Sequence, residues 1–179
     1  MKEKEAIEFL RGKLDLSSLK SWADLGCGSG VFTRALASLL SQGSLIYAID
    51  KTPGAIADKN GVHIKTITLD FLSAPLPFDK IDGFLLANSI HYVKEKSAFI
   101  QKLLSHLHES GVIFLVEYDT DMPNRWVPYP LRFDDLEKLF SDHGFSSIER
   151  LHSMPSIYQR AGLYSALVRK GIIEPTYET

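Results

Sequence analysis

Short runs of apolar residues alternate along the chain with segments in which apolar residues recur every three or four positions. The short runs predict strands, whereas the second spacing places the apolar residues on one face of a helix. Strands that alternate with helices predict parallel strands joined by crossover helices. The expected strands are residues 21–25, 45–49, 62–69, 81–87, 112–117, 147–152 and 164–168, and the expected helices are residues 3–13, 30–41, 53–59 (short), 96–108 and 133–143.

This pattern predicts a three-layer α/β fold whose doubly wound, Rossmann-like sheet has seven mostly parallel strands and an antiparallel edge strand. Residues 81–87 are almost continuously apolar, which indicates a strand buried on both faces. Residues 118–132 cannot form a regular element, because Pro123, Pro128 and Pro130 each remove a backbone donor. We expect a single domain over the whole chain, in which residues 1–20 carry an N-terminal helix.

The 179 residues are within the usual range for one domain. The 20 Lys and Arg are balanced by 22 Asp and Glu, so no basic field favours nucleic acid as a partner. Cys27 is the only cysteine, which excludes an internal disulfide and a multi-cysteine zinc site, and we expect no metal. The sequence shows neither a secretory pattern nor an apolar run of about 20 residues, so we expect a cytoplasmic protein without a membrane span.

Residues 24–30 (DLGCGSG) lie where the first expected strand meets the next helix, which is where ligands bind in doubly wound sheets. Glycines allow a tight turn and a close approach to a ligand. The dinucleotide pattern G-x-G-x-x-G would require a glycine at the position of Val31. Asp50 follows the second strand, 24 residues beyond Gly26, where an acid can accept hydrogen bonds from ribose hydroxyls. These features indicate a nucleoside ligand without deciding which one.

The spacing Asp-x-Gly-x-Gly-x-Gly resembles the first motif of class I S-adenosylmethionine-dependent methyltransferases. The resemblance extends over residues 22–168 and is greatest to small-molecule enzymes of the type 11 and type 25 groups. The other segments that carry it are residues 69–71 (LDF), 76–78 (LPF), 81–82 (ID), 88–93 (NSIHYV) and 136–145, the last resembling a helix that ends in Gly-Phe.

The resemblance implies S-adenosylmethionine as the cofactor and a role for each part of its pocket. The glycine loop would pass under the methionine moiety, with Asp24 facing the ammonium group. Asp50 would hold the ribose diol, and Asp70 would meet the adenine amino group with Phe71 beside the ring. Simpler explanations stay open, because glycines also serve tight packing and Asp also ends strands and forms turns. The expected cofactor-binding residues are Asp24, Gly26, Cys27, Gly28, Asp50, Lys51, Asp70, Phe71, Asn88 and Ser89.

The sulfonium of this cofactor is an activated methyl donor, so the protein mainly has to align the acceptor and exclude water. A general base is needed only where an oxygen, nitrogen or carbon acceptor must lose a proton. His91 is the strongest candidate, because it follows the fourth strand and titrates near neutral pH. It is also suited to cap the next helix or to contact the cofactor. Tyr92 is the second catalytic candidate, and Glu117 lies at the same rim.

The irregular segment supplies flat apolar side chains and a few polar groups that suit a small organic ligand. We therefore expect residues 119–132 to be a lid on the acceptor side; the alternative is a loop in which Trp126 packs over the fifth strand. About 20 residues precede the first strand, which is fewer than many small-molecule methyltransferases use for a lid. The pocket is then either open or completed by the second subunit of a homodimer. The expected acceptor-pocket residues are Tyr118, Arg125, Trp126 and Tyr129.

We expect methyl transfer to a small-molecule acceptor by in-line displacement. A non-catalytic module that binds the same cofactor fits the motifs equally well, because no catalytic residue is obligatory. An NAD(P)-dependent oxidoreductase is less favoured because of Val31 and the short chain. The sequence at residues 88–91 lacks the Asn/Asp-Pro-Pro-aromatic signature of enzymes that methylate nucleobase or glutamine amino groups. The acceptor atom is left open between oxygen, nitrogen, sulfur and carbon.

Overall fold

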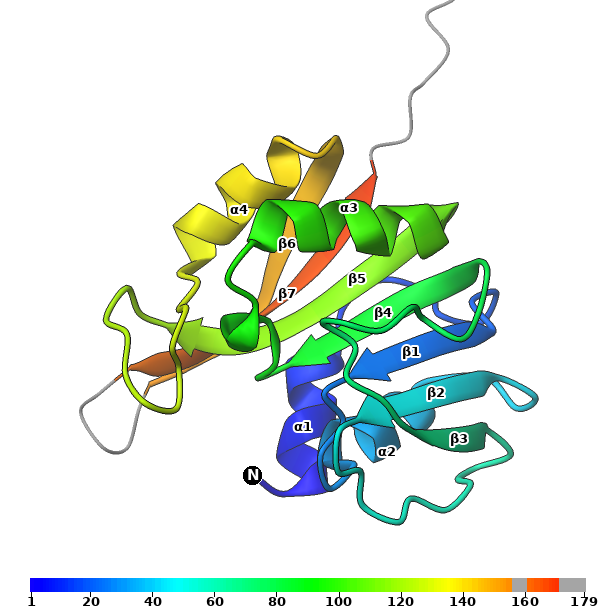
Figure 1. Ribbon diagram of the computed structural model, residues 1–179. Coiled ribbons are helices and arrows are strands. Elements are labelled where there is room, and N and C mark those ends of the chain that lie inside the picture. The colour runs from blue at the N-terminus through cyan, green and yellow to red at the C-terminus, as the bar shows by residue number, and fades with distance from the viewer. Residues whose placement is uncertain (156–160, 171–179) are drawn as a thin grey trace, which may run out of the picture.

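The structure is a computed structural model that describes residues 1–155 and 161–170 (Figure 1). Within these residues, seven strands form one sheet in the order β3-β2-β1-β4-β5-β7-β6. β1 to β5 are parallel, and β7 pairs antiparallel with both β5 and β6. The predicted fold class is therefore confirmed. The strands are β1 Ser21–Leu25, β2 Leu45–Asp50, β3 His63–Thr68, β4 Ile81–Ala87, β5 Leu107–Asp119, β6 Phe145–Met154 and β7 Gly162–Lys170.

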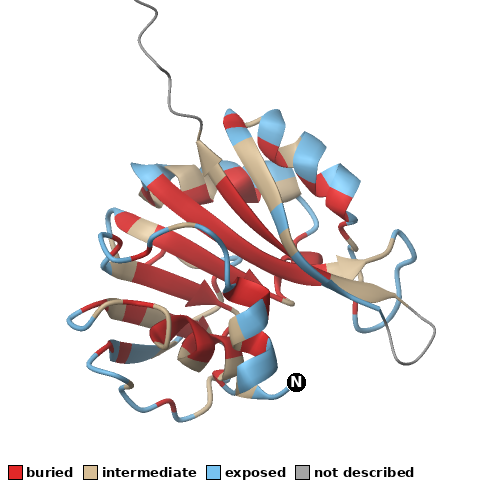
Figure 2. Cartoon of the chain, turned by 180° about the vertical axis from the view of Figure 1, so that it is seen from behind, coloured by how far each residue is buried: buried red, intermediate tan, exposed pale blue. Residues whose placement is uncertain are grey.

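Helices cover both faces of the sheet. On one face lie α1 (Glu3–Leu10) and α2 (Val31–Ala37), and on the other lie α3 (Lys96–His106) and α4 (Phe133–Ser141) (Figure 1). The buried apolar side chains divide in the same way, because one cluster joins α1 and α2 to the sheet and another joins α3 and α4 to it. Figure 2 shows the central strands buried between these layers, as expected for a parallel sheet covered on both sides.

The pairing of β1 with β4 depends on a large residue opposite a small one. Trp22 of β1 is fully buried, and its ring stacks on that of Phe114 with 5.7 Å between centroids. Gly83 of β4 pairs with Trp22, and a Cβ atom at this position would lie 2.3 Å from Trp22 Cζ3. A larger residue at position 83 would therefore push the two strands apart, together with the site at their carboxyl ends.

The loop between β2 and β3 contains no helix, so the short helix predicted at residues 53–59 is wrong. The Gly54 amide donates to the Gly28 carbonyl at 2.8 Å. Asp58 Oδ1 accepts from the Ile64 amide, also at 2.8 Å. These contacts hold the loop against the glycine loop and β3, in place of the backbone bonds that a helix would make within itself.

The other predicted elements differ from the structure only at their ends. α2 ends at Ala37, before the predicted end at residue 41, and the helix predicted over residues 96–108 ends at His106, because β5 begins at the next residue. The irregular segment predicted over residues 118–132 is wrong at its start, because Tyr118 and Asp119 pair with β7 and extend β5. Residues 120–132 contain neither helix nor strand, as their prolines predict. Among the described residues, no helix is both long enough and apolar enough to cross a membrane.

Candidate functional site

A cavity of about 480 Å³ lies beyond the carboxyl ends of β1, β2, β3 and β4. Most of the predicted cofactor-binding residues line it, together with Tyr92, one of the two catalytic candidates. Thr52 and Leu72 also line it and were not predicted, although each lies within two residues of an acid that was. The lining residues are Gly26, Asp50, Lys51, Thr52, Asp70, Phe71, Leu72, Asn88, Ser89 and Tyr92.

The glycine loop that follows β1 has a backbone that only glycine adopts easily. Gly26, Gly28 and Gly30 have φ angles of 87°, 50° and 80°. A Cβ atom on Gly26 would lie 2.6 Å from Ser89 Cβ, so the space beside the cavity also excludes a side chain. The amides of Gly26 and Cys27 both donate to the Ile49 carbonyl, at 2.8 and 3.1 Å. The end of β2 therefore holds the loop in place.

Asp50 joins the end of β2 to the glycine loop. Its Oδ2 accepts from the Gly28 amide and its Oδ1 from the Thr52 amide, both at 2.9 Å. A carboxylate has about four acceptor positions, and these amides use two of them. Asp50 lines the cavity, so it can still accept hydrogen bonds from the hydroxyl groups of a ligand.

Asp24 is fully buried behind the loop and does not line the cavity. Its Oδ2 accepts from Thr33 Oγ1 at 2.6 Å, while its Oδ1 has no partner in the part of the chain that the structure describes. Burial raises the pKa of Asp24 to about 7; the Thr33 hydrogen bond opposes this shift, and the charge of Asp50 adds to it. A cationic group near the unpartnered oxygen would favour the ionised form.

Cys27 is buried in the same loop and takes part in the apolar cluster beneath α2. Burial raises the pKa of its thiol to about 12, and the charges of Asp24 and Asp50 add to the shift. A thiol with so high a pKa is a poor nucleophile at neutral pH. Cys27 therefore acts as a small loop residue, and its predicted contact with the cofactor stays a prediction.

Asp70 follows β3 and faces Lys51 across one end of the cavity. The distance from Lys51 Nζ to Asp70 Oδ2 is 3.0 Å, and this hydrogen bond lowers the pKa of Asp70. The Asp70 side chain also accepts from the Leu72 amide at 3.1 Å, so it shapes the local turn as well. Lys102 of α3, which sequence reasoning missed, donates to the carbonyl of Phe71 at 2.8 Å and fixes this loop.

Asn88 and Ser89 follow β4 and present buried polar atoms that lack partners. Asn88 adopts a φ of 53°, which is uncommon for a residue with a side chain, and its amide donates to the Val116 carbonyl at 2.8 Å. Among the described residues, neither Asn88 Oδ1 nor Ser89 Oγ has a hydrogen-bond partner. Both residues line the cavity, and these two buried atoms lie just behind its surface.

His91 and Glu117 form a buried pair at the carboxyl ends of β4 and β5. His91 Nδ1 lies 2.8 Å from Glu117 Oε1 and 2.9 Å from Oε2, and the two side chains are 3% and 0% exposed. Glu117 Oε1 also accepts from the Tyr118 amide at 2.8 Å. His91 does not line the described cavity, but its ring centroid lies 4.4 Å from that of Tyr92, which does.

The four predicted acceptor-pocket residues do not line this cavity, and the structure separates them into two pairs. Tyr118 and Tyr129 lie beside His91: the Tyr118 ring centroid is 6.2 Å from the His91 ring, and the Tyr129 amide donates to the His91 carbonyl at 3.0 Å. Trp126 is 70% exposed, with the Arg125 guanidinium 5.3 Å from its ring. Trp126 therefore does not pack over the fifth strand. The acceptor-pocket role of all four residues stays a prediction.

The strand order, the glycine loop after β1 and the acids after β2 and β3 define a doubly wound α/β fold with a cavity at the carboxyl edge of its sheet, where such folds bind their ligands. The sequence profile described as "Methyltransferase domain" matches residues 23–115, more than half of the chain. The chain belongs to this methyltransferase domain family; it is an S-adenosylmethionine-dependent methyltransferase, and it binds that cofactor. An NAD(P)-dependent oxidoreductase is therefore excluded.

Solved structures share the fold at low sequence identity. The 1,6-didemethyltoxoflavin-N1-methyltransferase of Burkholderia thailandensis has a TM-score of 0.71 and 16% identity, over 95% of this chain and 78% of that one. The N-methyltransferase NodS of Bradyrhizobium japonicum has a TM-score of 0.69 and 18% identity, over 94% of this chain and 96% of that one. The arsenic(III) methyltransferase CrArsM of Chlamydomonas reinhardtii has a TM-score of 0.67 and 19% identity, over 96% of this chain and 71% of that one. No curated protein sequence matches the chain.

Proposed function

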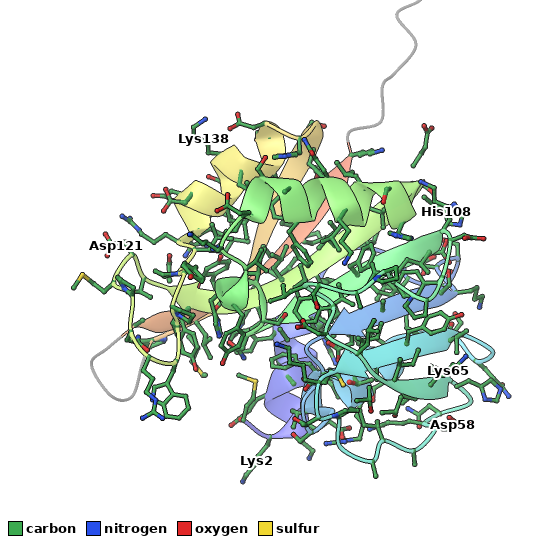
Figure 3. All side chains as sticks on the ribbon, viewed as in Figure 1. Lys2, Asp58, Lys65, His108, Asp121 and Lys138 are labelled. Atoms are coloured by element: carbon green, nitrogen blue, oxygen red, sulfur yellow. The ribbon has the colours of Figure 1, made fainter. Side chains whose placement is uncertain are left out.

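We propose that the chain transfers the methyl group of S-adenosylmethionine to a small-molecule acceptor by in-line displacement. The observation that carries this proposal is the cavity of about 480 Å³, which is in the range of small-molecule sites and is lined both by acids that suit the cofactor and by the partly exposed Tyr92. Charges of both signs are distributed over the surface: Lys2, Lys65 and Lys138 project from separate parts of the chain, as do Asp58 and Asp121 (Figure 3), and the formal net charge is −2. This distribution favours a small acceptor over nucleic acid.

The polar groups of the cavity fit the parts of the cofactor. Asp50 retains acceptor capacity for the ribose hydroxyls, and Asp70 would accept from the adenine amino group after exchanging its contact with Lys51. Asp24 Oδ1 is the buried acceptor that the ammonium group would satisfy, directly or through water. When bound, the cofactor supplies a methyl group already activated on its sulfonium sulfur.

The acceptor would enter beside Tyr92, which lines the cavity and is 49% exposed. Structural neighbours support a small acceptor, because they include enzymes named for 1,6-didemethyltoxoflavin and for arsenic(III). We assign His91 the role of general base for an acceptor that must lose a proton, because its ring lies 4.4 Å from that of Tyr92, which lines the cavity. The remaining task of the chain is to orient the acceptor and to exclude water.

The proposal is tested by incubating the protein with S-adenosylmethionine and small phenols, amines, N-heterocycles and thiols, and by measuring methylated product and S-adenosylhomocysteine by mass spectrometry. Asp50→Asn should weaken binding of S-adenosylhomocysteine at least about tenfold, equivalent to about 1.4 kcal/mol. Asp79→Asn, an exposed carboxylate outside the cavity, is the matched control. Binding of the cofactor without any methylated small molecule, or product only with a macromolecular acceptor, would overturn the proposal.

A further inference from the structure

The His91–Glu117 pair joins the segment after β4, which lines the cavity through Asn88, Ser89 and Tyr92, to the carboxyl end of β5. β4 and β5 are neighbouring parallel strands in which Ala87 is opposite Val116. Glu117 is therefore the next residue at the carboxyl end of β5, and His91 lies in the short 3₁₀ helix η1 (Ile90–Tyr92) that follows β4. Both carboxylate oxygens of Glu117 are within 2.9 Å of His91 Nδ1. The Glu117 carboxylate thus contacts the imidazole at Nδ1 and leaves Nε2 without a contact to it.

The burial of this pair is not required by the fold. Burying a carboxylate is unfavourable unless it is well paired, and apolar residues in place of a buried pair are often as stable or more so. Glu117 has 0% exposure and pairs across the sheet with Tyr164, in a strand that is otherwise apolar from Val112 to Val116. An apolar residue would continue this pattern, so the carboxylate points to a function.

A carboxylate beside Nδ1 determines how the imidazole can act. It accepts the Nδ1–H bond, so the neutral ring keeps its unprotonated nitrogen at Nε2, and it stabilises the imidazolium that forms when Nε2 takes a proton. Among the described residues, the other ionisable groups beside the pair are Tyr92, Tyr118, Lys96 and Tyr164. Burial raises the pKa values of Tyr118 and Tyr164, and the charge of Glu117 adds to both shifts, so both phenols stay neutral.

We propose that Glu117 is a positioning residue that presents His91 Nε2 as the base, and that the methylated atom of the acceptor is an oxygen or nitrogen bearing a proton. This inference rests on the proposed function. The acceptor lone pair forms the bond to the methyl carbon, and the electron pair of the broken carbon–sulfur bond stays on sulfur. The acceptor proton passes to His91 Nε2. The positive charge that began on the sulfonium thus ends on an imidazolium beside a carboxylate.

The kinetic test compares Glu117→Gln with Glu109→Gln, an exposed residue of the same strand that serves as the control. Glutamine keeps the shape and can accept from Nδ1–H but lacks the charge. With a phenol or amine acceptor, Glu117→Gln should lower kcat by at least about 100-fold, the lower limit of typical general-base effects, and Glu117→Asp should restore part of it. The KM for S-adenosylmethionine should change less than twofold. An equal loss in cofactor affinity, or an unchanged kcat, would overturn the inference.

A thiol acceptor and a spectroscopic test separate the two proposals. Above about pH 8.5 a thiol is largely ionised and needs no base, so Glu117→Gln should methylate it as fast as the wild-type protein does.

In protein labelled with ¹⁵N-histidine, the His91 signals, assigned with His91→Gln, should show a proton on Nδ1 and none on Nε2. Glu117→Gln should produce a mixture of tautomers. A wild-type proton on Nε2 alone would refute the role of Glu117 even if methyl transfer is observed. If no acceptor is methylated, the proposed function fails, whereas the tautomer measurement still tests Glu117.

Discussion

The protonation state of Asp24 is coupled both to the stability of the fold and to ligand binding. Its carboxyl group is fully buried, with one oxygen bonded to Thr33 and the other without a partner among the described residues. Its pKa is raised by burial to about 7, so the folded protein holds this proton more tightly than the unfolded chain does. The ligand-free protein therefore carries a neutral Asp24 below neutral pH, and a bound ammonium group would reverse that preference.

The ligand-free protein should lose stability as the pH rises from about 4, near the unfolded pKa, to about 7. In this window the folded state binds more protons than the unfolded state, so this group contributes a slope of up to about 1.4 kcal/mol per pH unit. Asp24→Asn should remove this dependence, and saturating S-adenosylhomocysteine should reduce it in the wild-type protein. Urea unfolding midpoints at several pH values measure both effects. Equal slopes for wild type and variant would contradict the role of Asp24.

Gly26→Ala should damage binding more than it damages the fold. The substitution would combine a positive φ with a Cβ atom 2.6 Å from Ser89 Cβ, beside the cavity. Gly43 has a φ of 83° but open space on its Cβ side, with no atom within 4 Å, so Gly43→Ala isolates the effect of backbone strain. Each substitution should lower the free energy of unfolding by about 1–2 kcal/mol through φ alone. Only Gly26→Ala should also weaken S-adenosylhomocysteine, at least about tenfold by calorimetry. Equal affinities in the two variants would count against the assigned role of the loop.

At the scale of elements, the segment after β5 is attached to η1 and α3 at one point. Lys96 Nζ donates to the Tyr129 carbonyl at 2.7 Å and to the Val93 carbonyl at 2.9 Å. The Tyr129 amide donates to the His91 carbonyl at 3.0 Å. Between this attachment and the end of β5, the segment carries Trp126, which is exposed. Lys96 is therefore one of the contacts that hold this segment, together with the Leu131 carbonyl, which accepts from the Tyr164 hydroxyl at 2.8 Å.

Lys96→Met should release that attachment while keeping the aliphatic part of the side chain. Hydrogen exchange of the amides in residues 120–132 should accelerate at least about tenfold, since a hydrogen bond from a charged donor contributes about 1.5–3 kcal/mol. The KM for an acceptor should rise while the affinity for S-adenosylhomocysteine stays the same. Lys94→Met, at an exposed position, is the control. Unchanged exchange in Lys96→Met would show that other contacts hold the segment.

Sequence patterns predicted the elements better than the contacts between them. The bounds predicted for β1 and β4 match the structure, because each is a mostly apolar segment flanked by lysine on one side and by glycine or asparagine on the other. The loop over residues 53–59 was mispredicted because the Gly54 amide bonds to the glycine loop and the Asp58 side chain bonds to the Ile64 amide, contacts that local propensity does not report. The acids of the cavity were predictable because they end parallel strands. The contacts of Lys96 and Lys102 were not, because a long flexible side chain can reach many carbonyls.

At the scale of the whole molecule, the cavity receives residues from both sides of β1, so ligand binding should stabilise the entire fold. S-adenosylhomocysteine at 100 times its Kd should add about 2.7 kcal/mol, which corresponds to an increase in Tm of roughly 5–10 °C for a chain of this size. Asp50→Asn should show a much smaller increase at the same concentration. Scanning calorimetry measures both. A wild-type Tm that does not respond would mean that the cofactor does not bind the native state.

The homodimer considered from the sequence stays a prediction. Met122 and Trp126, which are 71% and 70% exposed, are the apolar side chains that a second subunit would cover. Light scattering should then give twice the mass of one chain, and Trp126→Ser should lower it towards the mass of the monomer. A wild-type protein that is monomeric at high concentration would leave the pocket open on this side.

The Ile49 carbonyl accepts hydrogen bonds from the amides of both Gly26 and Cys27. This contact should affect the rate at which the ligand associates. S-adenosylmethionine carries a sulfonium charge but no phosphate, so its capture depends on the acids of the cavity and on whether the binding surface already has the right shape at each encounter. Because the sheet itself holds the turn, little chain entropy is lost on docking, and association should proceed without a slow rearrangement of this strand end. Differences in affinity among ligand analogues should then arise mainly from their dissociation rates.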